Sequence, residues 1–210
     1  PGTLEPWNAG TLTDPSAADC HDHVVFRMSS GATVTFNDPR RFGLMDLVPR
    51  DELSRHRVLG ALGPEPLAPE FDAAVLAQAC RGRKTSLKAA LSDQRVIAGL
   101  GNIYICEALH RARLSPRRRA STIATRTGAP RDTAYRLAAA IRRVLNDAIV
   151  RTAAPQEVGP VARAAGAYAG ARFRVYDRAG VRCPRPGCRG TVKRIVQTGR
   201  STYFCPVCQT

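Results

Sequence analysis

The sequence predicts a multidomain α+β protein, and three features of the 210-residue chain support this. The first part alternates apolar and polar residues with the period of β-strands, and the middle part has the apolar spacing of helices. The C-terminal part holds four cysteines in two close pairs. We expect a β domain at 1–58, a linker at 59–71, a helical domain at 72–171 and a cysteine-bearing domain at 172–210.

The charge of the chain indicates a polyanionic partner. Lysine and arginine number 32 against 17 acidic residues, which gives a net charge of +15. Such an excess is typical of proteins that bind nucleic acid or another anionic surface. No apolar run reaches the roughly 20 residues that cross a bilayer, and the N-terminus has no export signal pattern. We therefore expect a cytoplasmic monomer, associated with the nucleoid and not with a membrane.

The N-terminal part predicts a small sheet. Residues 1–20 are rich in turn formers and are expected to form a loop, and 24–28 and 33–36 flank Ser29-Ser30-Gly31 as a β-hairpin. A third strand is expected at 42–48. A sheet of three strands must bury one face against something, so we infer that partner strands are missing.

The rest of the chain predicts helices followed by short strands. The 59–71 linker is rich in proline and glycine. We expect helices at 71–80, 84–97, 103–112 and 132–150, a loop at 155–171 and a strand at 172–176.

The stretch 88–116 predicts two helices joined by a glycine turn. Gly99 and Gly101 allow positive φ values and close backbone approach. Asn102 is expected to cap the second helix, and a helix start of this kind can bind an anion. An ordinary helical hairpin with a solvated basic face is the alternative. The arginines that follow are Arg111, Arg113, Arg117, Arg118 and Arg119.

The C-terminal cysteines predict one structural zinc ion. Cys183 and Cys188 are followed after sixteen residues by Cys205 and Cys208. Four thiolates satisfy tetrahedral Zn²⁺ and leave no open position for catalysis. Disulfides, or iron in place of zinc, are the alternatives. We expect a β-hairpin between the pairs, turning at 198–200, and expect the other cysteines to be buried or inert, namely Cys20, Cys80 and Cys106.

Three separated motifs resemble one enzyme family. They are NDPRRFG at 37–43, LSDQRVIAGLGNIYICEALHRARLSP at 91–116, and VYDRAGVRC with QTGRSTYFCPVCQ at the C-terminus. In order and spacing they are similar to bacterial formamidopyrimidine-DNA glycosylases. The related endonuclease VIII branch shares the helix–two-turn–helix and the zinc finger, but DPRRFG and GPEPL favour the formamidopyrimidine branch.

The resemblance implies a fold and an activity. The fold is an N-terminal β-sandwich, a helix–two-turn–helix domain and a β-hairpin zinc finger. The activity is the excision of oxidised purines, such as 8-oxoguanine and formamidopyrimidines, from duplex DNA, followed by nicking of the abasic site. Enzymes that act on a base extrude it from the stack, and the loop at 155–171 matches the one that covers the flipped base.

The resemblance also assigns roles to particular residues. Arg40 and Phe42 match the residues that fill the void left by the flipped base and hold the orphaned cytosine; a structural turn with a buried phenylalanine is the alternative. Glu107 is expected to be structural, and a strand-edge histidine is the alternative for the first of the backbone contacts. The expected contacts to the DNA backbone are His21, Arg83, Lys84, Lys88 and Asn102, and Arg200 matches a catalytic residue that binds phosphates beside the lesion.

The chain departs from the family at its start. The family opens with a Pro-Glu helix, in which the proline amine is the nucleophile, and no such helix is recognisable here. Pro1 stands in a loop-like context, so we interpret its position as chance. We therefore expect a family member whose N-terminal catalytic segment is missing from this chain. The alternative is a non-catalytic DNA-binding fragment, while a zinc-dependent hydrolase is disfavoured because four cysteines close the metal site.

Overall fold

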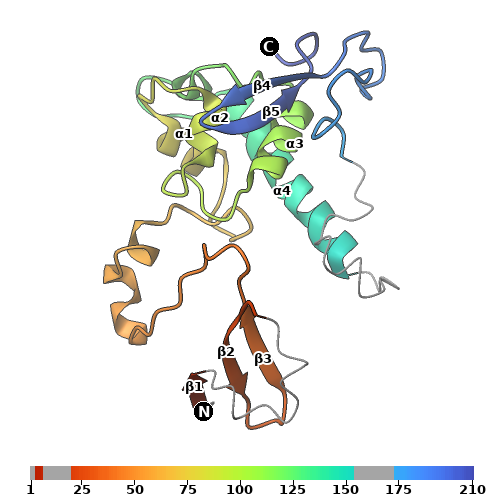
Figure 1. The fold of residues 1–210 in the computed structure, drawn as a ribbon. Helices are drawn as coiled ribbons and strands as arrows, with labels where there is room; N and C mark the ends of the chain where they lie inside the picture. Colours follow the sequence, from red (N-terminus) through yellow and green to blue (C-terminus); the bar gives the residue numbers. More distant parts are fainter. Residues whose placement is uncertain (1–2, 7–19, 154–172) are drawn as a thin grey trace. The chain divides into compact units, whose positions relative to one another are not determined.

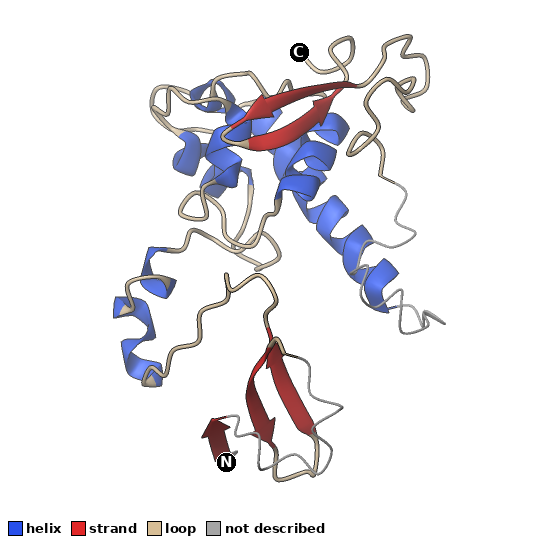
Figure 2. Ribbon diagram, in the orientation of Figure 1, coloured by secondary structure: helices blue, strands red, loops and turns tan. Residues whose placement is uncertain are grey.

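The computed structural model describes residues 3–6, 20–153 and 173–210. The chain divides into two compact units, an N-terminal unit (Pro1–Leu53) and a C-terminal unit (Ser54–Thr210). Figure 1 traces the elements of each unit along the chain, and Figure 2 separates helices from strands. The loop expected at 155–171 lies outside the described residues, as does most of the loop expected at 1–20.

The N-terminal unit is a three-stranded antiparallel sheet in the order β1-β2-β3. The predicted hairpin is confirmed by β2 (Asp22–Arg27) and β3 (Thr33–Asn37). The prediction of loop for the whole of 1–20 is wrong, because β1 (Thr3–Pro6) pairs with β2. No described residue from 20 to 53 is buried, which fits a sheet too small to enclose a core.

The strand predicted at 42–48 is also wrong, since this segment is irregular. Its entry is folded into a turn: the Asp38 carboxylate accepts hydrogen bonds from the backbone N–H of Arg40 at 3.3 Å and of Gly43 at 2.6 Å. The side chains that follow are not packed, and Leu47 is 84% exposed. A strand forms only where a neighbour accepts its ladder of hydrogen bonds, and no described strand lies alongside.

The C-terminal unit is built on four helices. They are α1 (Ala73–Cys80), α2 (Leu87–Ser92), α3 (Asn102–Ala112) and α4 (Asp132–Ala153), with short 3-10 helices at Arg50–Arg55, Leu59–Ala61 and Ala120–Ile123. Helix α4 packs against both α1 and α3. The core between them is closed by apolar side chains with at most 1% exposure, including Leu76, Leu109, Leu137 and Ile141. None of the helices in the described ranges has the length and hydropathy that spanning a bilayer requires.

Helix α2 is shorter than the predicted 84–97. Ser86 caps its start, because the Ser86 hydroxyl accepts the backbone N–H of Ala89 at 3.2 Å. The helix ends at Asp93, whose carboxylate accepts the backbone N–H of Arg95 at 3.0 Å. An aspartate that binds its own backbone in this way competes with the helical pattern. The apolar residues after it, Val96 and Ile97, are buried in the turn instead.

The C-terminal hairpin matches the prediction. Strands β4 (Lys193–Gln197) and β5 (Arg200–Phe204) pair antiparallel. Thr198 and Gly199 between them have φ values of 48° and 70°, as the two-residue turns that suit hairpins require. The strand predicted at 172–176 is absent from the described part, 173–176. The backbone N–H groups there bind a side chain of α3, so they are not available to a neighbouring strand.

Candidate zinc centre and nucleic-acid interface

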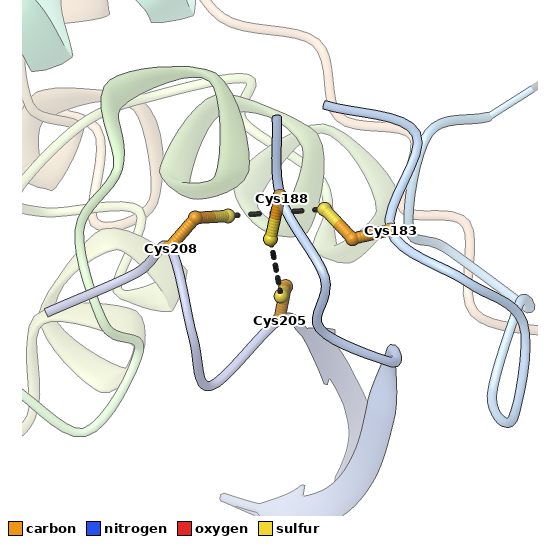
Figure 3. A group of neighbouring side chains, drawn as sticks. All are labelled: Cys183, Cys188, Cys205 and Cys208. Carbon is orange, nitrogen blue, oxygen red and sulfur yellow. Dashed lines mark hydrogen bonds between the residues drawn. The ribbon is translucent and has the colours of Figure 1, made fainter. Parts of the chain in front are cut away.

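The four cysteines at the C-terminus form a metal site. Their Sγ atoms all lie within 4.8 Å of one another, and Figure 3 shows them converging from two loops. The distance is 3.8 Å from Cys183 to Cys208 and 3.7 Å from Cys188 to Cys205. A tetrahedral zinc with Zn–S bonds of about 2.3 Å separates its sulfurs by about 3.8 Å. All four are free thiols, so the disulfide alternative is wrong, and the site fits Zn²⁺.

A buried histidine joins this metal site to helix α3. His110 is fully buried, and its Nε2 lies 3.4 Å from Cys183 Sγ. Burial lowers the pKa of His110 to about 4, and the nearby cations Arg185, Arg174 and Arg111 lower it further. The imidazole is therefore neutral at physiological pH, and with its proton on Nε2 it can donate to the sulfur. Arg185 adds a second link by donating from Nη2 to the carbonyl of His110 at 2.6 Å.

A second set of hydrogen bonds fixes the hairpin against the start of α3. Asn102 Nδ2 donates to the carbonyl of Ser201 at 2.9 Å. Gln197 Nε2 donates to Ser86 Oγ at 3.3 Å and to the carbonyl of Pro116 at 3.4 Å. These bonds hold the turn of the hairpin beside α2 and α3, so residues far apart in the sequence form one surface.

The expectation that Asn102 caps α3 is wrong. Gly101 occupies the cap position without a side-chain hydrogen bond, and Asn102 is the first helical residue. Its amide binds the zinc-finger hairpin instead. The cap therefore leaves the first N–H groups of α3 without a side-chain acceptor, and these groups carry the positive end of the helix dipole.

The glycine turn before α3 is open. Gly99 has φ +70°, which favours glycine, and a Cβ built there would meet no atom within 4 Å. Gly101 has φ −83°, so the positive φ expected there is not observed. A Cβ at Gly101 would also meet nothing within 4 Å. No described group of this chain covers the backbone at either position.

Lys88 is fully buried, which nothing in the sequence predicted. Its Nζ has no hydrogen-bond partner among the described residues. Burial lowers the pKa of Lys88, Arg200 lowers it further, and Cys106 opposes these effects. An amine buried without a partner is costly, and the electrostatic effect of Arg200 places Lys88 near the start of β5.

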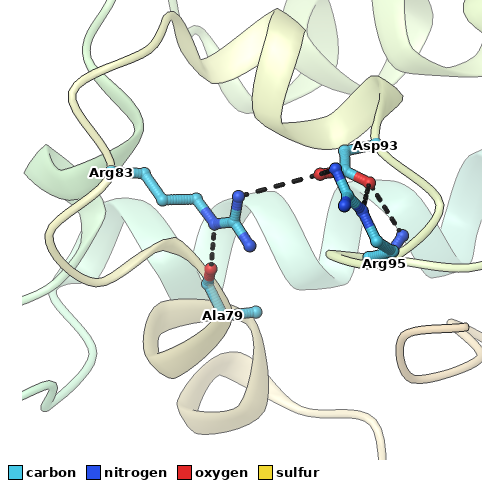
Figure 4. Close-up of polar contacts among 4 residues, drawn as sticks. All are labelled: Ala79, Arg83, Asp93 and Arg95. Atoms are coloured by element: carbon cyan, nitrogen blue, oxygen red, sulfur yellow. Dashed lines mark hydrogen bonds and ion pairs between the residues drawn. The ribbon is translucent and has the colours of Figure 1, made fainter. Parts of the chain in front are cut away.

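Arg83 is held in position by the helical domain, as Figure 4 shows. Its Nε donates to the carbonyl of Ala79 at 2.8 Å, and its Nη1 lies 3.7 Å from Asp93. Asp93 also receives a two-point hydrogen bond from Arg95, at 2.9 and 3.1 Å. The hydrogen bonds from Arg95 lower the pKa of Asp93, so this carboxylate is charged at physiological pH. Lys84, the neighbouring candidate, is exposed.

The remaining candidates divide between the two units. Arg200 is exposed at the first residue of β5. In the N-terminal unit, His21 is half-buried, and the Arg40 guanidinium lies 5.0 Å from the centre of the Phe42 ring. Phe42 is 80% exposed, so the buried-phenylalanine alternative is wrong. Within the C-terminal unit, the structure brings Lys88, Asn102 and Arg200 to one surface.

Glu107 is a structural residue whose partners the sequence did not reveal. Its carboxylate accepts the backbone N–H groups of Arg174, Val175 and Tyr176, at 2.9, 2.9 and 3.0 Å. Gln209 has a similar role, because it accepts the N–H of Cys205 at 2.8 Å. Both are buried polar side chains. Their spacing in the sequence carries no signal, since their partners are backbone groups.

These features define a class: a helix–two-turn–helix protein with a β-hairpin zinc finger. The family model described as the Formamidopyrimidine-DNA glycosylase H2TH domain matches residues 62–157. The model described as the zinc finger found in FPG and IleRS matches residues 180–210. The four cysteines identified above therefore form a zinc-finger site for one structural zinc.

Similar proteins give the family. The formamidopyrimidine-DNA glycosylase of Rhodopseudomonas palustris (strain HaA2) is 57% identical over 202 residues, which is 96% of this chain and 69% of that protein. The enzyme of the same name from Bradyrhizobium diazoefficiens is 58% identical over 189 residues. A Lactococcus lactis enzyme of the family, solved with DNA containing FAPY-dG, is 27% identical, with a TM-score of 0.74, over 100% of this chain and 71% of that one.

The chain belongs to the formamidopyrimidine-DNA glycosylase family. The match to the Bradyrhizobium enzyme covers 90% of this chain and 64% of that relative. The predicted fold class, an α+β protein with strands of the N-terminal domain, a helix–two-turn–helix and a zinc finger, is confirmed.

Proposed function

We propose that this protein acts in base-excision repair, as part of a glycosylase and abasic-site lyase for oxidised purines in duplex DNA. The observation that carries the proposal is the surface on which Lys88, Asn102 and Arg200 meet. It combines two cationic side chains with the uncovered N-terminus of α3, and such an arrangement suits phosphate oxygens. The names of the relatives support the same substrate class.

The glycine turn supports an approach by DNA. A phosphodiester can reach the first N–H groups of α3 only if no side chain stands in front of them. Built Cβ atoms at Gly99 and Gly101 meet nothing within 4 Å, so this path is open among the described residues. The backbone there can bind phosphate in any sequence context, as a repair enzyme that scans DNA requires.

Lys88 and Arg200 have separate roles in this proposal. Lys88 has a buried Nζ without a partner, so a nearby phosphate would supply the missing negative charge once the covering side chains move. Arg200 is exposed on a hairpin that the zinc site holds in place. Its guanidinium offers a fork of donors that matches two phosphate oxygens. We assign to Arg200 the contact beside the lesion and a part in strand cleavage.

In the N-terminal unit, Arg40 and Phe42 suit the gap left by an extruded base. Phe42 is 80% exposed and Arg40 lies over its ring. An apolar ring can enter a base step and wedge it open, and a guanidinium can hydrogen-bond the edge of the unpaired base. We assign His21, Arg83 and Lys84 to the DNA backbone.

We further propose that these 210 residues bind damaged DNA without excising the base. Excision through a Schiff base needs an amine held at the sugar C1′, and no Pro-Glu helix like that of the family is recognisable here. The alternative, a non-catalytic DNA-binding module, predicts the same binding. It differs in that restoring such a helix would not restore chemistry.

Borohydride trapping on an 8-oxoguanine duplex tests both proposals. The 210-residue chain should give no covalent adduct, whereas it should bind a duplex with an abasic analogue more tightly than an undamaged duplex. A chimera carrying the N-terminal segment of the Rhodopseudomonas relative should form the adduct and nick the strand. An inactive but folded chimera supports the binding module. Equal affinity for damaged and undamaged duplexes would contradict the repair function, and an adduct from the unmodified chain would contradict the second proposal.

A further inference from the structure

A second basic surface lies on the helical domain, in a groove of about 1010 Å³. Four arginines line it: Arg81, which follows α1, Arg118 and Arg126 on either side of the 3-10 helix Ala120–Ile123, and Arg131, just before α4. One carboxylate, that of Asp132, also lines the groove. The volume is in the range of ligand sites and exceeds what a single small ion would fill.

The protein holds three of these arginines by bonds that leave guanidinium nitrogens available. Arg81 Nε donates to the carbonyl of Arg126, and Arg131 Nε donates to the carbonyl of Ala124, each at 3.1 Å. Arg118 Nε donates to Thr122 Oγ1 at 2.7 Å. A guanidinium fixed through Nε directs its two Nη groups outward, so less side-chain entropy is lost when an anion binds.

No carboxylate among the described residues neutralises these four charges. None of the four arginines forms an ion pair there, and Asp132 pairs instead with Arg136 at 3.2 Å. Like charges that share one groove repel each other, and this repulsion is relieved when an anion enters.

The same unit contains a second arginine-lined groove, which provides a contrast. It has a volume of about 560 Å³ and is lined by arginines of α3 and α4. Here the charges are compensated: Arg111 and Arg143 both bind Asp147, each at 3.1 Å, and Arg136 binds Asp132. Two grooves of similar composition thus differ in whether their positive charge is already satisfied.

The uncompensated groove is continuous with the surface assigned above to DNA. The backbone N–H of Ser121 donates to the carbonyl of Arg83 at 3.1 Å, and that of Ala120 to the carbonyl of Thr85 at 2.9 Å. Leu87 donates to the carbonyl of Arg118 at 2.6 Å. The wall of the groove and the segment that leads to Lys88 are therefore joined by a run of backbone hydrogen bonds.

We propose that this groove binds phosphodiester groups of the same duplex, beyond those that reach Lys88, Asn102 and Arg200. The inference rests on the proposed DNA-binding function. The groove is continuous with that surface, it is longer than one phosphate, and its charges have no internal partner. It enlarges the DNA footprint without reading the base sequence, because phosphate contacts carry no sequence information.

The test compares two double variants that remove the same charge. Arg126→Ala with Arg131→Ala changes the uncompensated groove, and Arg136→Ala with Arg143→Ala changes the compensated one. Binding to an undamaged 30-base-pair duplex and to one with an abasic analogue is measured by fluorescence anisotropy across a range of salt concentrations. Each lost phosphate contact should reduce the slope of log K against log salt by about 0.9. The first variant should lose about 1.8 on both duplexes, and the control much less.

Two further measurements separate folding from binding. Arg126 makes no side-chain hydrogen bond that loss of Arg126 would break, so Arg126→Glu should fold normally and should weaken binding more than Arg126→Ala. Arg126→Lys should restore most of the slope. Thermal unfolding and zinc content identify any variant that fails to fold.

The possible outcomes are distinct. Equal slopes for the two folded double variants, or no change with Arg126→Glu, would overturn the groove assignment while leaving the proposed function intact. A wild-type chain that binds neither duplex would contradict the proposed function itself. If inorganic phosphate raises the melting temperature of the wild type but not of the first variant, while DNA slopes are equal, the groove binds small anions and the inference is wrong.

Discussion

Asn102 Nδ2 lies 2.9 Å from the carbonyl oxygen of Ser201, to which it donates a hydrogen bond. The first residue of α3 is thereby joined to the residue that follows Arg200 in β5. The amide has left the capping role that its position in the sequence suggests. The helix terminus and the zinc-finger arginine consequently form one surface, and a substitution at Asn102 should affect both.

We expect Asn102→Ala to weaken binding to abasic-analogue DNA and to lower the free energy of unfolding by about 1 kcal/mol, the net value of one such hydrogen bond. The measurements are anisotropy titration and denaturant unfolding. Ser201→Ala is the matched control, because it keeps the carbonyl that accepts the bond. If both variants bind DNA equally well, the bond does not organise the surface.

Glu107→Gln should destabilise the C-terminal unit. The carboxylate accepts three backbone N–H groups, whereas glutamine has one acceptor oxygen and would direct an NH₂ group at a donor. Losing charge-assisted bonds at a buried site should cost about 1.5–3 kcal/mol. Denaturant unfolding measures the loss, and amide exchange at 174–176 should speed up. Glu70→Gln, at an exposed glutamate, should change neither.

Cys205→Ser should abolish the zinc site. The chain should bind one zinc ion, and removing a thiolate from a four-cysteine site should release it together with the ordered hairpin, because metal binding supplies folding energy in so short a module. Metal analysis and circular dichroism check this. Cys20→Ser, at an exposed cysteine outside the site, should retain one zinc. An intact hairpin in metal-free protein would show that zinc is dispensable.

Lys88→Met should raise stability and weaken DNA binding at the same time. The buried Nζ has no partner, so replacing it with an apolar chain of similar length should increase the free energy of unfolding by about 1–3 kcal/mol. Since the pKa of Lys88 in the folded state is below 10.5, the unfolded state binds the proton more tightly. The gain should be largest at low pH and shrink as the pH rises through the folded pKa towards 10.5.

Denaturant unfolding of Lys88→Met and wild type at several pH values measures this difference. Lys84→Met, at an exposed neighbour, should leave stability nearly unchanged at every pH. A loss of stability in Lys88→Met would show that the lysine has a compensating partner.

Arg200→Ala should weaken binding to damaged DNA more than Arg119→Ala, although both arginines are exposed. Arg200 begins a strand held by the zinc site and by the bond from Asn102 to Ser201, so its fork of donors should reach a phosphate with less entropy to lose. In the chimera with a family N-terminal segment, it should also impair nicking. A gel assay separates binding from cleavage, and Arg200→Lys should recover part of the binding only. Equal behaviour of the two alanine variants would make the zinc finger a structural cap.

The sequence by itself determined the features that depend on local pattern. The spacing of Cys183, Cys188, Cys205 and Cys208 predicted the metal site, because a tetrahedral centre needs only four thiolates on two tight loops. The turn at 198–200 and the helices α1, α3 and α4 followed from glycine placement and apolar periodicity, which act over a few residues.

Tertiary structure decided the features that depend on distant partners. The segment 173–176 does not form a strand, because Glu107 takes its backbone N–H groups, and 42–48 does not, because no described strand accepts its ladder. Asn102 binds Ser201 across 99 residues of sequence. The burial of Lys88 and the uncompensated arginine groove likewise arise only when separated segments pack together. Periodicity and spacing describe neighbours along the chain, whereas these partners are set by packing in space.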